Sequence, residues 1–223
     1  MKNADSGAVN GKPDKLWSKD YISLMAANFL LYFAECLLLT VLPVYLKQNG
    51  AGDFQIGIVA AVFYITSMFM RTLTSKVSAR IGRKVLLLLA MFVFACSMVG
   101  YYLFAGLAMI LILRLVQGLG FGASTTLYGS TVASTISNER MGEGMGFFGL
   151  GISVAYVLGP CLGAAAVSQT YFQWVFLLAA MLVLLSMLLT CFIKADHFEQ
   201  SAENPTKDTH WLSDVVEPKV IFE

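Results

Sequence analysis

The chain contains the stretch Arg114-Leu-Val-Gln-Gly-Leu-Gly-Phe-Gly122, in which a guanidinium and an amide interrupt otherwise apolar or small residues. It continues Gly106-Leu-Ala-Met-Ile-Leu-Ile-Leu113 without a break. In a membrane helix Arg114 would need a partner or water, because a charge at the bilayer centre costs about 2.5 kcal/mol or more. Gly118 and Gly122 share one helical face, a spacing that lets a neighbouring helix come close. We therefore predict a membrane helix with a functional charge, and a purely structural ion pair is the alternative.

The composition is typical of an all-α polytopic membrane protein. Hydrophobic residues make up 57% of the chain and charged residues 13%, whereas a soluble domain has about 25% charged residues. Six apolar runs are each long enough to cross a bilayer. They cover Tyr21–Tyr45, Phe54–Thr74, Val85–Phe104, Leu107–Val132, Gly144–Val167 and Phe172–Ile193. We expect a multi-pass protein of the cell membrane with six transmembrane helices embedded in the lipid bilayer.

The positive charges predict how the chain is divided and oriented. Nearly all Lys and Arg residues flank the runs on one side, whereas Lys47 stands alone on the other. Because cytoplasmic loops carry the excess of Lys and Arg, both termini are expected in the cytoplasm. We predict a cytoplasmic tail over residues 1–19, a six-helix membrane domain over 20–194 and a cytoplasmic linker or tail over 195–223. The first apolar run is too long for a signal peptide, so we expect it to be retained.

Several kinds of chemistry are not indicated. The four cysteines lie inside apolar runs without metal-ligand spacing, and we expect them to be small buried hydrophobic residues. They are Cys36, Cys96, Cys161 and Cys191. Both histidines, His197 and His210, lie in the C-terminal tail, which disfavours a haem site, a membrane zinc protease or a Ser–His hydrolase. A formal net charge of +1 gives no reason to expect a nucleic-acid partner. We expect no cofactor, no metal site and no enzymatic activity.

The first apolar run carries two polar residues, Asn28 and Glu35, which are seven residues apart and so share a helical face. Glu35 lies about 16 Å from one end of its run and Arg114 about 10 Å from the corresponding end of its own, at 1.5 Å per residue. These depths are close enough for the two long side chains to meet. We expect Glu35 and Arg114 to be partners.

The fifth apolar run carries small residues at every fourth position, namely Gly151, Ala155, Gly159 and Gly163. Such a stripe lets another helix pack closely. Pro160 removes a backbone hydrogen bond and can bend the helix. We expect a close packing seam, which can be static or can serve as a gating contact.

A basic stretch, Arg80-Ile-Gly82-Arg83-Lys84, follows the second run. It resembles the loop between helices 2 and 3 of major facilitator superfamily transporters, whose pattern is G-x-x-x-D-[RK]-x-G-R-[RK]. Arg80, Gly82, Arg83 and Lys84 match, whereas Ser75 and Ala79 replace the Gly and the Asp. In the family this Asp is associated with charge contacts that help to hold one face closed, so the resemblance implies a weaker latch here.

Three further stretches carry the same resemblance. Arg114-x-x-Gln117-Gly118 is similar to the R-x-x-Q-G signature of helix 4, and Asn138-Glu139-Arg140-x-Gly142 to the loop before helix 5. Gly159-Pro160-x-x-Gly163 resembles the G-x-x-x-G-P-x-x-G-G signature of drug/proton antiporters, with Ala155 and Ala164 in place of two glycines. The resemblance covers about Lys15 to Ile193.

The resemblance implies the N-terminal half of a transporter whose substrate site lies between two six-helix halves. We expect a second half, as a separate chain or a second copy, with the present chain being a split half or a truncated product. The implied function is proton-coupled export of small organic molecules. Glu35 would titrate, Arg114 would hold it ionised, and Asn28 and Gln117 would contribute hydrogen bonds. The alternative is a non-transporting membrane subunit that pairs with or modulates another transporter half.

The distribution of Lys and Arg yields a test of orientation. A reporter that is active only in the cytoplasm should be active when it is fused after Glu223, and a reporter that is active only outside should be silent there. A fusion within the segment that follows Lys47 should give the opposite result. Activity of the external reporter at Glu223 would contradict the predicted orientation.

Overall fold

The computed structural model describes residues 16–104, 106–168 and 172–193. This part of the chain is helical and contains no β-strand, so the all-α prediction is confirmed. Its helices are α1 (Lys19–Gln48), α2 (Asp53–Ile81), α3 (Arg83–Leu103), α4 (Leu107–Thr135), the short 3-10 helix η1 (Asn138–Arg140), α5 (Met141–Ser168) and α6 (Phe172–Phe192). Six of them are long and apolar enough to cross a membrane. Most of the predicted tails, residues 1–15 and 194–223, lies outside the described residues.

The helix ends have local causes in the sequence. The hydroxyl of Ser18 accepts a hydrogen bond from the backbone N–H of Tyr21 at 3.1 Å and caps the start of α1. Gly82 separates α2 from α3 with a φ of +85°, a left-handed conformation that favours glycine. The predicted second span ended at Thr74, but α2 continues to Ile81. Arg80 therefore belongs to the helix and not to a loop, because charged residues extend a helix beyond the membrane without ending it.

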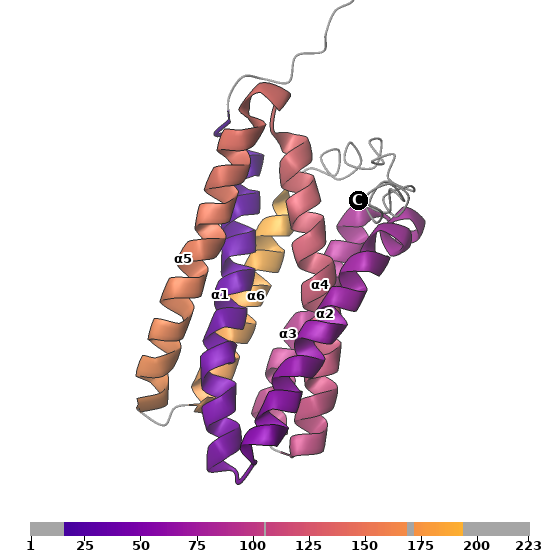
Figure 1. The fold of residues 1–223 in the computed structure, drawn as a ribbon. Coiled ribbons are helices and arrows are strands. Elements are labelled where there is room, and N and C mark those ends of the chain that lie inside the picture. The colour runs from indigo at the N-terminus through magenta and orange to yellow at the C-terminus, as the bar shows by residue number, and fades with distance from the viewer. Residues whose placement is uncertain (1–15, 105, 169–171, 194–223) are drawn as a thin grey trace, which may run out of the picture.

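The helices form two groups of three, each centred on one helix (Figure 1). α1 packs against α5 and α6, whereas α4 packs against α2 and α3. The groups are joined mainly where α3 meets α6, and α1 meets α4 over a smaller area. The second three helices repeat the first three, with α4, α5 and α6 corresponding to α1, α2 and α3. Exchanging each helix for its counterpart leaves this set of neighbours unchanged. Such internal repeats are a common feature of transporter folds.

Buried hydroxyl groups connect the helices on one side of the bundle. The Tyr128 hydroxyl on α4 lies 2.5 Å from the Thr190 hydroxyl on α6. Ser186 on α6 donates to the carbonyl of Ala27 on α1 at 2.5 Å. In a membrane such hydrogen bonds help to hold helices together, because lipid offers polar groups no alternative partner. This cluster thus links α1, α4 and α6 independently of the charged residues.

Glycines allow two pairs of helices to approach closely. A Cβ atom on Gly118 would lie 2.6 Å from the carbonyl oxygen of Phe63, and one on Gly122 would collide with the backbone of Ser67, so α4 fits against α2 only with glycine at both positions. On α5, a Cβ on Gly159 would collide with Cys36 of α1, and one on Gly163 would lie 3.1 Å from the carbonyl oxygen of Leu37.

The predicted stripe on α5 is shorter than its sequence pattern. Ala155, Gly159 and Gly163 are buried, and Gly159 and Gly163 lie against α1. A Cβ on Gly151, however, would have open space around it. Gly151 therefore makes no close contact within the described bundle, because four-residue spacing drifts off a straight contact line along the helix. Its packing role stays a prediction. Pro160, in contrast, lies inside α5, which continues through it.

The two glycines on α5 provide a matched pair of variants. Gly159→Leu should separate α5 from α1 and destabilise the protein, because overpacking a close contact costs about 1–3 kcal/mol or more. Gly151→Leu should have little effect, because its side chain enters open space. Thermal unfolding in detergent compares the two. Equal melting temperatures for both variants would show that the α1–α5 seam is not as close as described.

Candidate functional site

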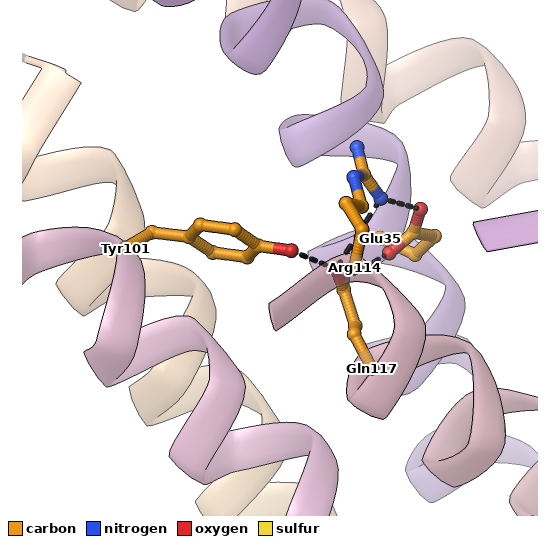
Figure 2. A network of polar contacts seen from close by, with 4 residues as sticks. All are labelled: Glu35, Tyr101, Arg114 and Gln117. Carbon is orange, nitrogen blue, oxygen red and sulfur yellow. Dashed lines mark hydrogen bonds and ion pairs between the residues drawn. The ribbon is translucent and has the colours of Figure 1, made fainter. Parts of the chain in front are cut away.

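Four polar side chains from three helices form a connected network inside the bundle (Figure 2). Arg114 Nη1 on α4 lies 3.0 Å from Glu35 Oε1 on α1. Gln117 Nε2 donates to Glu35 Oε2 at 2.7 Å. The Tyr101 hydroxyl on α3 donates to Gln117 Oε1 at 2.6 Å. The contact expected between Glu35 and Arg114 is therefore present, and it lies where α1 meets α4.

The network is almost completely removed from solvent. Glu35 is 5% exposed, Arg114 2% and Gln117 0%. Both oxygens of the Glu35 carboxylate have donors, one charged and one neutral. These hydrogen bonds to the carboxylate matter because a buried ion pair is tolerated only when additional hydrogen bonds satisfy its remaining polar atoms. Removing one member would leave the other with an uncompensated charge or an unused lone pair.

Gln117 holds the arrangement in one orientation. Its Oε1 accepts from Tyr101 and also lies 3.3 Å from Arg114 Nη1, while its Nε2 donates to Glu35. Because the amide oxygen and nitrogen have different partners, a flipped amide would lose these contacts. Arg114 and Gln117 are three residues apart and so lie on one face of α4. The sequence spacing thus explains why both reach the same carboxylate.

Arg114 also touches an aromatic ring. Its guanidinium carbon lies 5.0 Å from the ring centroid of Phe63 on α2, within the range of a cation–π contact. Its Nε has no hydrogen-bond partner among the described residues. The guanidinium is therefore held by one carboxylate, one amide and one ring, and it retains an unused donor.

Tyr101 is a member of the network that the sequence interpretation missed. It lies near the end of an apolar run next to Tyr102, where two tyrosines are easily read as interfacial aromatic residues. The useful signal was its hydroxyl group, which would need a partner if the side chain were buried. Tyr101 is 1% exposed, whereas Tyr102 is 42% exposed.

Asn28 does not join the network. It is buried, and its Oδ1 has no hydrogen-bond partner among the described residues. Asn28 and Glu35 share a face of α1, but seven residues correspond to about 10 Å along a helix at 1.5 Å per residue. A shared face therefore did not bring Asn28 to the carboxylate of Glu35, and its predicted contribution is not visible in this arrangement.

The basic motif between α2 and α3 has a structural contact of its own. Lys84 Nζ donates to the backbone carbonyls of Cys191 at 3.1 Å and Ile193 at 2.7 Å. Both carbonyls lie at the end of α6, where a cation is favourable. Arg80 is exposed and Arg83 is half-buried, and neither forms an ion pair with an acidic residue that the structure describes.

The burial expected for the cysteines is wrong for three of the four. Cys36 is buried, whereas Cys96, Cys161 and Cys191 are exposed on the described surface. The reason is that an apolar position in a membrane helix faces either other helices or lipid, so hydrophobicity alone does not predict burial. Within the described segments, no group of three His, Cys, Asp or Glu residues lies close enough to hold a metal ion.

Comparison with known proteins shows which family the chain resembles. The Major Facilitator Superfamily model matches residues 24–222. The multi-drug resistance efflux pump PmrA of Streptococcus pneumoniae is 25% identical over 201 residues, which cover 86% of this chain and 50% of PmrA. The quinolone resistance protein NorA of Staphylococcus aureus is 22% identical over 135 residues, which cover 60% of this chain and 35% of NorA.

A solved structure shares the fold. The human organic anion transporter MFSD10 (TETRAN) superposes with a TM-score of 0.66 at 21% sequence identity, over 78% of this chain and 47% of that protein. The chain thus spans half or less of the length of each of these three proteins. Since the family model covers most of the chain and the six membrane helices have the matching fold, the chain belongs to the major facilitator superfamily.

Proposed function

We propose that this chain is the N-terminal half of a proton-coupled exporter of small organic molecules. The observation that carries the proposal is the ion pair of Glu35 and Arg114, which is buried where the two three-helix groups meet. Ionisable groups inside membrane helices are rare and typically mark ion or substrate pathways. Membership of the superfamily and the similarity to proteins named as efflux pumps support export as the activity.

Protonation of Glu35 would change the forces between α1 and α4. The ionised carboxylate attracts the Arg114 guanidinium and accepts the Gln117 amide. A neutral carboxyl group loses the attraction to Arg114, and the buried guanidinium then lacks a counter-charge. A proton can therefore favour a second arrangement of the two three-helix groups, which is what a population shift between two access states requires.

We further propose that a second six-helix half completes the substrate site. α2 and α5 are the least buried of the membrane helices, and they flank α1 and α4. They therefore offer surface to a second half as well as to lipid. In this proposal both termini are cytoplasmic and the basic stretch that ends in Lys84 lies on the cytoplasmic side, in accord with the positive-inside rule.

Transport in proteoliposomes tests the function. The chain should be reconstituted alone and together with a six-helix C-terminal half, with an aromatic anionic dye outside and an acidic lumen. A proton-coupled exporter oriented inside-out should accumulate the dye while protons leave. Glu35→Gln should abolish the dependence on the pH gradient, because the variant lacks the titrating carboxyl group.

The matched control is Glu143→Gln. Glu143 lies at the start of α5 in a half-exposed ion pair with Arg140, and surface pairs of this kind contribute little. This control should transport like the wild type. An unchanged pH dependence in Glu35→Gln would contradict the role of Glu35. Absence of transport by the wild type with and without a second half would favour a non-transporting subunit.

A further inference from the structure

A second guanidinium, that of Arg71, lies within the membrane-spanning part of α2 and has no role in the network around Glu35. It lies 18 residues after the start of α2 and 10 before its end, or about 27 Å and 15 Å along the helix at 1.5 Å per residue. Arg71 is exposed on the described chain. A charge at such a position needs a partner or water.

The surroundings of Arg71 show where it points. The hydroxyl of Tyr32 on α1 interacts with the Arg71 side chain and with the hydroxyl of Thr125 on α4. Arg71 is therefore directed toward the two central helices. An Arg that only reached along lipid tails to the headgroups would be directed away from them.

Arg71 has no acidic partner in the described part of the chain. It forms no ion pair there, and both oxygens of Glu35 already have donors. Asp53 and Glu143 pair with other residues at helix ends. The described membrane interior thus holds two guanidiniums and one carboxylate, which leaves one positive charge to be balanced from outside these residues.

Tyr32, which interacts with Arg71, belongs to a group of three tyrosines, and we call Tyr32, Tyr64 and Tyr156 the tyrosine face. The rings of Tyr32 and Tyr156 lie 5.9 Å apart between centroids. Tyr156 also lies near enough to Tyr64 and to Glu35 for electrostatic interaction. Tyr64 is 50% exposed and Tyr156 49% exposed. The face therefore presents ring surfaces from α1, α2 and α5, and it meets the unbalanced guanidinium of Arg71 at Tyr32.

We propose that Arg71 binds the acidic group of an aromatic organic anion whose ring packs on the tyrosine face. The inference rests on the proposed function, because it names the substrate class of the same half-transporter. A guanidinium matches the geometry of a carboxylate with two parallel hydrogen bonds, and aromatic rings prefer offset or edge contacts with other rings. A carboxylate supplied by a second half would balance the charge but would not account for the tyrosine face that Arg71 meets at Tyr32.

Equilibrium binding to the full chain in phosphatidylcholine nanodiscs tests the proposal. The probes are naphthoate and its neutral analogue naphthamide, which differ mainly in charge. The wild type should bind naphthoate about tenfold or more tightly than naphthamide, since hydrogen bonds to charged groups are the stronger ones. Arg71→Gln should remove this preference, and Arg71→Lys should keep part of it. Lys76→Gln, a change of another exposed base on α2, should behave like the wild type.

A second variant provides a test that does not depend on whether the Arg71 variants fold. Tyr156→Leu should weaken naphthoate and naphthamide alike, because it removes a ring surface and leaves the charge. Equal affinity of the wild type for both probes, or an undiminished preference in Arg71→Gln, would overturn the proposal. Proton-linked transport by the wild type is measured separately, so an intact preference for naphthoate without transport separates a failure of coupling from a failure of the substrate assignment.

Discussion

The buried ion pair between Glu35 and Arg114 is the constraint on which the arrangement of the two three-helix groups depends. α1 and α4 meet over a small area, and the pair lies within it. A desolvated charge without a partner is costly, so the two helices must present these side chains to each other at the same depth. Gln117 and Tyr101 complete the hydrogen bonds and thereby extend the constraint to α3.

Other contacts fix the rest of the bundle around this pair. Gly118 and Gly122 bring α2 against α4, and Gly159 and Gly163 bring α5 against α1. The Tyr128 cluster links the same central helices through neutral groups. Neutral hydrogen bonds and close glycine contacts do not respond to a proton, whereas the carboxylate does. The Glu35 carboxylate is thus surrounded by contacts that carry no charge of their own.

The sequence allowed six helices, their order and the Glu35–Arg114 contact to be predicted, because apolar run length and the cost of a buried charge are strong constraints. It did not predict which face of a helix meets a neighbour. For this reason Asn28 was placed with Glu35, Gly151 was included in the α5 seam and three exposed cysteines were expected to be buried. Tyr101 was missed because its role depends on the helix opposite. The contact of Lys84 with the end of α6 joins segments far apart in the sequence.

A double-mutant cycle of unfolding free energy in detergent tests most directly whether Glu35 and Arg114 are energetic partners. Glu35→Gln and Arg114→Gln should each destabilise the protein by about 3–5 kcal/mol, because each leaves one buried charge alone. The double variant should recover much of that loss, since no unpaired charge remains, and the coupling energy should clearly differ from zero. Two single losses that simply add in the double variant would show that the residues are not partners and would contradict the account.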